Sequence, residues 1–464
     1  MTVALAVTVW VVLALIAVVR PRFGAILIWF MTWNYPNAPL FGTLPLNARL
    51  DDLWVVFMFV VCLISPQSRK TTGLVVWLAL AWWLSVLIGN LAGLLVTGVQ
   101  AWESTVKFAA KGLYIPMTAY ILSSLLHKPE HLESHLRWMC IAAAVAGAIA
   151  IGSVYFPYRF EAFLPPITES GMTGVEQVEA VADTEARRAG GSLGIVSLGM
   201  LMMNISLLSL AMVVYRVRLA ARAFYAAICG ACLVTLAYTI SRGAIVGLIG
   251  AVCWALVFAR RRAAFVLVAI GATVVLLLQG GVVERVLARF SGGATPYATT
   301  FEEGLAGRFD VLRIFIENLS PAFFLTGIGM PSASSHLHAT AHSAYLGALV
   351  YSGIPGLVVL VLAIHRGVVL GRRAARVPAD RTSQALGTYM LMLVVGMMVV
   401  GLSAESFQLV WPAQLYFAAL VFAERGLAQV PAAPLTRLVR PPPMAPGLVM
   451  PAIAAPRPEP RRHP

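Results

Sequence analysis

The stretch Ala341-His342-Ser343-Ala344-Tyr345-Leu346 ends a long polar segment and leads, through Ser352-Gly353-Ile354-Pro355-Gly356, into an apolar run. The polar segment extends from Glu284 to His342, between two strongly apolar runs, and it is rich in arginine and histidine. A connection of this length is usually functional or disordered. Its Gly327-Ile328-Gly329 turn and its internal helical pattern favour an ordered, functional segment.

The composition places the chain among polytopic membrane proteins. Of its 464 residues, 59% are hydrophobic and 12% are charged, and the mean hydropathy is +0.83. A soluble domain is nearer half apolar and a quarter charged. The apolar runs are long enough to cross a hydrocarbon core as helices of about 20 residues. They show no strand alternation, so we expect an all-α transmembrane bundle.

The apolar runs predict about 12–13 transmembrane helices. Their centres lie near residues 11, 28, 58, 84, 115, 146, 203, 231, 251, 272, 354, 394 and 415. With thirteen spans, every short basic cluster falls on one side, which should be the cytoplasm because lysine and arginine are retained there. The clusters are Arg20/Arg22, Arg69/Lys70, Lys128/Arg137, Arg216/Arg218/Arg222, Arg260–Arg262, Arg366–Arg381 and the residues after Arg425. The net charge of +14 is therefore explained by basic residues that determine membrane topology, and it does not indicate nucleic-acid binding.

The same count predicts the domain organisation. Residues 1–426 should form the bundle, with external segments at 156–190 and 282–342, the second being a large loop between spans ten and eleven. Residues 427–464 are rich in Pro, Ala and Arg and predict a disordered cytoplasmic tail.

Several cations on the predicted outer side are candidate anion ligands. Arg242 stands almost alone between two apolar runs; it either snorkels to the interface or binds an anion through its guanidinium fork. Lys107 and Lys111 are four residues apart and share a helix face, where they contact lipid headgroups or a bound anion. Arg308 opens an amphipathic helix, and Arg313 lies well round that helix from it.

The histidines of the polar segment allow two interpretations. His338 and His342 have the i, i+4 spacing of a zinc pair, and His336 is a possible third ligand. However, the segment lacks the glutamate of a zincin helix, and no cysteine is near. A single histidine that accepts a proton at the membrane surface fits better. We therefore predict no metal and no cofactor.

The C-terminal half resembles the O-antigen ligase and polymerase superfamily over about 120 residues. The resemblance rests on ordered motifs: Ser241-Arg242-Gly243-Ala244, Gly307-Arg308, Gly327-Ile328-Gly329, and the two stretches quoted at the outset. Arg188 before Gly190-Gly191 is similar to a further family feature. Near the N-terminus, Arg20–Gly24 and Asn34–Pro36 resemble the subgroup of O-glycosylation ligases found with exosortase systems.

This resemblance implies an all-helical C-type glycosyltransferase. Such enzymes transfer a glycan from an undecaprenyl-pyrophosphate carrier to an acceptor at the outer face of the bacterial inner membrane. The acceptor is lipid A–core, a growing polysaccharide or a protein hydroxyl. The family histidine corresponds to His342, and the family arginines to Arg242 and Arg308. Ser343 stands where the family often has Asn. The predicted substrate contacts are Arg188, Lys107, Lys111, Ser343 and Tyr345.

The chemistry of these residues agrees with that implied activity. Arginines can stabilise a departing pyrophosphate. His342 can deprotonate the acceptor hydroxyl, whose attack opposite the phosphate inverts the anomeric carbon. On the same scaffold, a polysaccharide polymerase or a protein O-oligosaccharyltransferase remains an alternative. A flippase for the same lipid is the alternative from another class, but it would need charges at the membrane midplane, where this chain has few.

Overall fold

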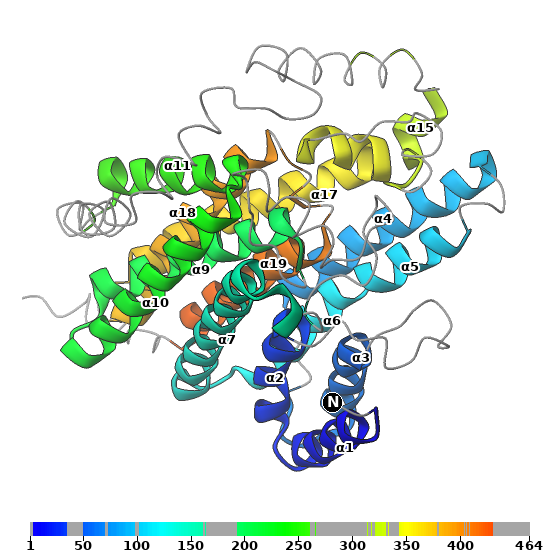
Figure 1. Cartoon of the computed structure of the whole chain (residues 1–464). Coiled ribbons are helices and arrows are strands. Elements are labelled where there is room, and N and C mark those ends of the chain that lie inside the picture. Colours follow the sequence, from blue (N-terminus) through cyan, green and yellow to red (C-terminus); the bar gives the residue numbers. More distant parts are fainter. Residues whose placement is uncertain are drawn as a thin grey trace, which may run out of the picture. The chain divides into compact units, whose positions relative to one another are not determined.

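The described part of the chain is predominantly helical. The computed structural model describes residues 3–34, 50–69, 73–97, 102–160, 163, 193–259, 265, 313, 317, 321–330, 333, 343–377, 380–402, 404, 406–407 and 409–429. None of these residues lies in a strand, which confirms the all-α prediction (Figure 1). Most of segments 156–190 and 282–342, and all but the first three residues of the predicted tail, lie outside these ranges.

The helices follow the apolar runs of the sequence. They are α1 (Val3–Val19), α2 (Pro21–Asn34), α3 (Leu50–Ile64), α4 (Leu74–Thr97), α5 (Trp102–Gly112), α6 (Tyr114–Leu125), α7 (Pro129–Tyr155), η3 (Pro157–Arg159), α9 (Ile195–Tyr215), α10 (Leu219–Thr239), α11 (Arg242–Phe258), α15 (Pro321–Thr326), α17 (Ala344–Ala375), α18 (Arg381–Gly401) and α19 (Val410–Ala428). Proline begins α7, where its missing N–H costs nothing. Asp380 caps α18, because its carboxylate accepts from the N–H groups of Thr382 and Ser383 at 2.9 and 3.1 Å.

The span count is only partly supported. Every predicted centre except the one near 272, which lies outside the described residues, falls within a helix. Six described helices, α4, α7, α9, α10, α17 and α18, are long and apolar enough to cross a membrane. The region around 115 differs from the prediction of one continuous span. It forms two short helices, α5 and α6, separated at Leu113, and Pro116 cannot donate a backbone hydrogen bond across that junction.

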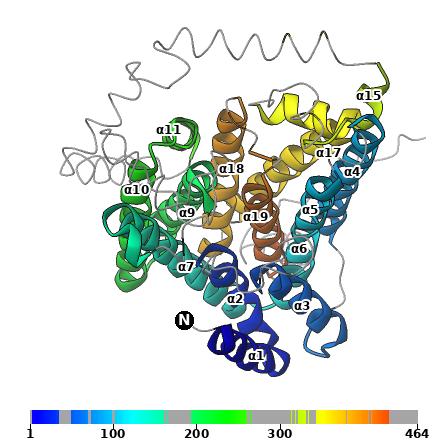
Figure 2. The same ribbon diagram turned by 45° about the vertical axis from the view of Figure 1, so that its right-hand side comes forward.

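The antiparallel helices α9 and α18 form the centre of the packing. Most of each helix is buried, whereas much of α10 is exposed. Thr388 of α18 donates to the hydroxyl of Tyr215 at 3.1 Å, and Tyr389 donates to the side-chain oxygen of Asn204. Figure 2 shows α18 and α19 between α7, α9, α10 and α11 on one side and α4, α5, α6 and α17 on the other. The site described below is built on this central pair.

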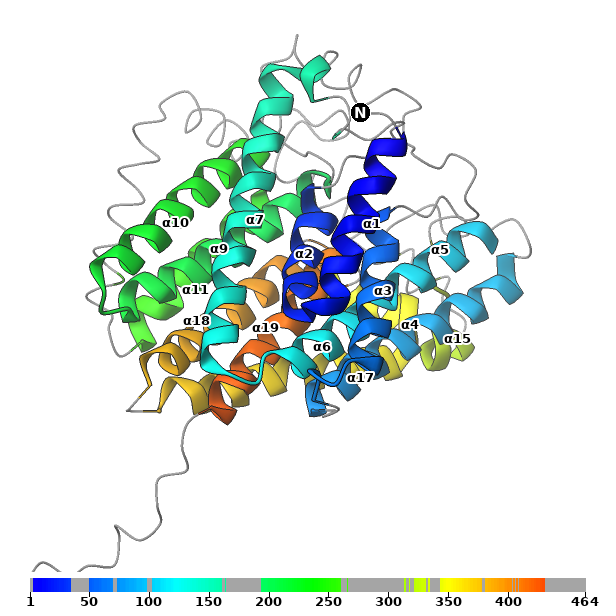
Figure 3. The same ribbon diagram turned by 90° about the horizontal axis from the view of Figure 1, so that it is seen from below.

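The N-terminal helices pack against α7 and α6 (Figure 3). The predicted second span is a helix of 14 residues, α2, and its position is fixed by buried tryptophans. Trp29 donates to Nε2 of His135 on α7 at 2.7 Å, and Trp54 on α3 donates to the carbonyl of Gly24 at 3.0 Å. A buried tryptophan usually has a hydrogen-bond acceptor for its indole N–H, and both of these tryptophans have one.

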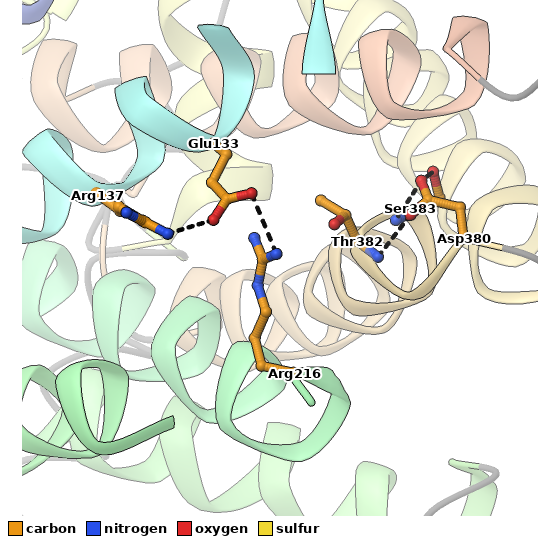
Figure 4. A network of polar contacts seen from close by, with 6 residues as sticks. All are labelled: Glu133, Arg137, Arg216, Asp380, Thr382 and Ser383. Atoms are coloured by element: carbon orange, nitrogen blue, oxygen red, sulfur yellow. Dashed lines mark hydrogen bonds and ion pairs between the residues drawn. The ribbon is translucent and has the colours of Figure 1, made fainter. Parts of the chain in front are cut away.

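Several of the predicted basic clusters gather at the end of the bundle where α9 ends and α18 begins. Glu133 of α7 pairs with Arg137 at 2.5 Å and with Arg216, after α9, at 3.2 Å (Figure 4). Arg366 of α17 pairs with Glu424 of α19 at 2.8 Å. These ion pairs connect clusters that are far apart in sequence. The packing therefore agrees with the prediction that they share one side.

Candidate functional site

The opposite end of α18 supports the two elements that carry the family motifs. Both α11, which begins at Arg242, and α17, which begins just after His342, pack along α18. Gly247 of α11 lies so close to α18 that a Cβ there would be 2.9 Å from the carbonyl oxygen of Gly396. Small residues allow this close approach of two membrane helices. The helix α18 thereby fixes the distance between the two motif-bearing elements.

The residues that follow His342 are anchored to the last turn of α18. The Ser343 hydroxyl donates to the carbonyl of Gly401 at 3.1 Å, and the Tyr345 hydroxyl donates to the carbonyl of Met398 at 3.1 Å. Carbonyls in the last turn of a helix have no partner within the helix, so side-chain donors can satisfy them. Each hydroxyl still has acceptor capacity. Both side chains, predicted as substrate contacts, therefore have an anchoring role in this structure.

Arg242 lies at a tight turn between α10 and α11. Ile240 adopts a left-handed conformation with φ of 50°, and the Ser241 N–H donates to the Thr239 hydroxyl at 3.2 Å. Gly199 of α9 packs beneath the turn, since a Cβ there would be 2.6 Å from that of Ser241. Arg242 itself is half-buried in the first turn of α11, where the helix dipole also favours an anion. The turn is therefore held rigidly against the central helix.

The Gly-Ile-Gly motif and the Gly-Ile-Pro-Gly motif are structural partners. Pro355 has no N–H, so the carbonyl of Tyr351 loses its helical partner, and a kink at Gly353 interrupts α17 there. The N–H of Ile328 donates to the carbonyl of Val350 at 2.8 Å, and that of Gly329 to the carbonyl of Tyr351 at 3.1 Å. The turn 327–329 thus satisfies the carbonyls that the kink exposes.

Glycine is required at this junction for two reasons. Gly353 has φ of 66° and ψ of −169°, a backbone conformation that is almost restricted to glycine. A Cβ at Gly327, whose φ is 73°, would lie 2.5 Å from the backbone nitrogen of Ser352. The close contact of two backbones leaves no space for a side chain. The motif glycines therefore determine the direction in which α17 leaves the junction.

Sequence reasoning missed a third partner of this junction, the pair Gly89-Asn90 on α4. A Cβ at Gly89 would overlap the carbonyl oxygen of Tyr351, and Oδ1 of Asn90 lies 2.5 Å from where a Cβ of Gly329 would be. Asn90 is buried, and its amide donates to the carbonyl of Val86 at 2.9 Å. A lone Asn next to Gly inside an apolar run was the available signal.

The two lysines lie on a different part of the bundle. Lys107 and Lys111 are half-buried on α5, which packs against α4 and α6. Trp83 of α4 donates to the carbonyl of Ala109 at 2.8 Å and fixes α5 in place. The contacts of α5 are thus with α4 and α6, whereas α11, which carries Arg242, and α17, which follows Ser343, pack along α18.

The remaining predicted site residues lie outside the part of the chain that the structure describes. His342, Arg308 and Arg188 lie outside the described residues, and so do His336 and His338 of the alternative zinc trio. Among the described residues there is no group of three or more potential metal ligands. The roles predicted for these three site residues stay predictions, while the neighbour of His342 in the sequence, Ser343, lies against the last turn of α18.

Comparisons with known proteins identify one segment. Residues 226–361 match the family model described as O-Antigen ligase. The matched segment begins within α10 and ends within α17, so it contains the Arg242 turn, the 327–329 turn and the kink. A search of curated proteins gave no significant match. Residues 226–361 therefore resemble an O-antigen ligase domain, which supports a relation of this chain to the O-antigen ligase superfamily.

Proposed function

We propose that the protein is an inverting, metal-independent glycosyltransferase of the O-antigen ligase type. It transfers a glycan from an undecaprenyl-pyrophosphate carrier to an acceptor hydroxyl. The reaction takes place at the outer face of the bacterial inner membrane, at the end of the bundle that carries Arg242 and Ser343. The basic clusters at the opposite end support this orientation, because positive residues mark the cytoplasmic side.

One observation carries this proposal. The family-matched segment supplies both the Arg242 turn and the residues directly after His342, and both pack against the same end of α18. A cation for the leaving group and a base for the acceptor must act on one glycosidic bond, so their supports must be held together. Three shared contacts, Ser343 to Gly401, Tyr345 to Met398 and Gly247 to Gly396, provide that support.

In the proposed reaction, His342 accepts the proton of the acceptor hydroxyl. The acceptor oxygen forms a bond to the anomeric carbon while the bond from that carbon to the pyrophosphate oxygen breaks. The electron pair leaves with the pyrophosphate, and Arg242 and Arg308 stabilise its charge. Arg188, Lys107 and Lys111 are proposed to contact the charged donor. Attack from the face opposite the leaving group gives the inverted product.

A transfer assay with the purified full-length protein tests this proposal. The donor is a synthetic undecaprenyl-pyrophosphate glycan, and the readouts are released undecaprenyl pyrophosphate and the anomeric configuration of the product by NMR. We expect inversion and full activity in EDTA. Retention of configuration, or activity lost in EDTA and restored by zinc, would contradict the mechanism. Donor that only changes leaflet in proteoliposomes, without transfer, would identify a flippase.

The acceptor class is tested separately by mass spectrometry of surface glycans from a deletion strain. If the protein is a ligase, complete chains accumulate on the carrier lipid. Unpolymerised single units would instead identify a polymerase. Loss of glycans from proteins alone would identify a protein O-oligosaccharyltransferase.

A further inference from the structure

The opposite end of the bundle contains a cluster of cations that the proposed reaction does not use. We call the residues Arg22, Arg69, His127, Lys128 and Arg425 the basic corner. They come from the start of α2, the connection after α3, the connection between α6 and α7, and the last turns of α19. Segments far apart in the sequence therefore contribute to one small region.

Hydrogen bonds hold these segments together. The Gln67 side chain donates to the carbonyl of Val19 at 3.3 Å, which joins the connection after α3 to the corner between α1 and α2. The Arg69 N–H donates to the carbonyl of Ser124 at 3.0 Å, and the Gln429 side chain donates to the carbonyl of Leu126 at 3.5 Å. The cations are thus positioned by folded backbone, not by chance proximity of flexible chains.

The electrostatics of the basic corner are unfavourable without a counter-ion. Arg22, Arg69 and Lys128 form no ion pair with any residue that the structure describes. Burial lowers the pKa of His127, and the positive charges of Arg69, Arg22 and Lys128 lower it further. Two carboxylates act on the edge of this cluster: Glu130 acts on His131, and Glu424, beside Arg425, already pairs with Arg366 at 2.8 Å. Like charges held together in this way repel unless an anion lies between them.

One buried atom indicates a ligand with hydrogen-bond acceptors. Nε of Arg22 is buried and has no hydrogen-bond partner among the described residues. Buried polar atoms are normally paired, so an unpaired guanidinium N–H in a cationic cluster requires an acceptor. A phosphate group supplies several acceptor oxygens and the compensating negative charge, and arginine binds it through two parallel hydrogen bonds.

We propose that the basic corner binds a phosphate group, supplied by an anionic phospholipid headgroup or by free phosphate. Basic residues that only determine membrane topology need to lie in the connections on the cytoplasmic side. That role does not require residues from different connections to lie close together. Here they converge from four elements, and some of their polar atoms are buried. The site lies at the end of the bundle away from Arg242, so its occupancy is independent of glycan transfer.

Binding to the full-length protein in neutral detergent tests this proposal. The probes are short-chain phosphatidylglycerol, short-chain phosphatidylcholine and inorganic phosphate, measured by native mass spectrometry and by thermal stabilisation. The variants are Arg22→Gln and Arg69→Gln. The matched control is Arg218→Gln, because Arg218 is an exposed arginine at the same end, before α10, and its loss removes the same charge. We expect each of the two variants to weaken phosphatidylglycerol binding by about tenfold or more, since hydrogen bonds to charged groups are strong.

The outcomes separate the two sources of phosphate. Phosphatidylglycerol binding that phosphatidylcholine does not reproduce, and that millimolar phosphate does not displace, identifies a lipid headgroup. Binding of inorganic phosphate with the same dependence on Arg22 and Arg69 identifies free phosphate. The proposal is wrong if Arg218→Gln weakens binding as much as the other two changes do, or if Arg22→Gln and Arg69→Gln bind normally. Size-exclusion profiles like that of the wild type ensure that each variant is folded.

Discussion

At the end of α18 that carries Gly401, neighbouring elements meet it through side-chain hydrogen bonds to backbone carbonyls and the close contact at Gly247. The end that carries Asp380 combines a close backbone contact, Gly387 against Ala375 of α17, with charged side chains nearby. A contact between two backbones tolerates little displacement. An ion pair on long side chains can persist over a range of geometries, and it contributes little when exposed. Both ends therefore hold α18 in position, and the end that carries Asp380 also places charge.

The largest effect should come from removing the proposed base. We expect His342→Ala to reduce transfer by about a hundred- to ten-thousand-fold, the range typical of general-base loss. His336→Ala and His338→Ala should remain largely active, and initial rates in the donor-lipid assay measure all three. Three equally severe losses would instead indicate a zinc trio.

Glycine substitutions where the 327–329 turn and α4 meet the kink of α17 should have the next largest effect on transfer. Gly353→Ala requires a conformation that is strained for alanine, and Gly89→Ala puts a methyl group onto the Tyr351 carbonyl. Each change should lower the free energy of unfolding by about 1–3 kcal/mol and reduce transfer, because α17 would leave the junction in another direction.

Gly230→Ala is the matched control for these variants. A Cβ at Gly230, within α10, meets nothing within 4 Å, so alanine there should be neutral or should stabilise the helix by up to about 1 kcal/mol. Thermal unfolding in detergent compares the three. Equal destabilisation by all three would show that the junction has no special role.

Arg242→Lys tests whether Arg242 acts through two parallel hydrogen bonds or only through its positive charge. Lysine retains the charge but cannot donate two parallel hydrogen bonds to a phosphate. We expect transfer to fall by about tenfold or more with unchanged thermal stability, and Arg218→Lys to have no effect. Full activity in both Arg242→Lys and Arg242→Ala would exclude this residue from the reaction.

A smaller effect should follow removal of the anchors to α18. Ser343→Ala and Tyr345→Phe each delete one hydrogen bond to a carbonyl of the last turn, so each should cost about 0.5–1.5 kcal/mol of stability and reduce transfer several-fold. Steady-state kinetics together with unfolding measurements separate anchoring from substrate contact. A raised KM for the acceptor with unchanged stability would favour direct contact.

The smallest effect on transfer should come from the charged end. Glu133→Gln removes the partner of both Arg137 and Arg216, in a network that is only partly buried. We expect a loss of stability of about 1 kcal/mol or less and a wild-type transfer rate. A large drop in transfer would mean that the two ends of α9 and α18 are coupled.

Much of the fold was predictable because apolar length and the position of charge act locally. Helices occur near almost every predicted centre, but α1, α3 and α11 have apolar portions of at most 17 residues, and the region near 115 is divided at Leu113. Hydropathy windows average over such breaks. Such windows indicate that a segment is buried or contacts lipid, but they do not show whether a single helix runs through it.

The candidate site was predictable in its motifs but not in its assembly. The sequence identified Arg242, Ser343, Tyr345 and the glycine motifs, yet it assigned Ser343 and Tyr345 to the substrate, while their hydroxyls donate to α18. The support itself, α18, lies beyond the family-matched residues 226–361 and has no unusual composition. The residue pattern of α18 does not indicate which helices pack on it.

The sequence by itself determined that this is an α-helical membrane protein with an O-antigen ligase motif set, because hydropathy, charge position and the need for glycine are properties of short segments. Proline at 355 even determined that a carbonyl in α17 would lose its partner. Only the tertiary structure decided that the 327–329 turn and Gly89 of α4 fill that position, and that α18 supports both motif elements. The physical reason is that tertiary packing decides which N–H group reaches an exposed carbonyl and which helices come into close contact. The residues that meet here are about 20 to 260 positions apart in the sequence.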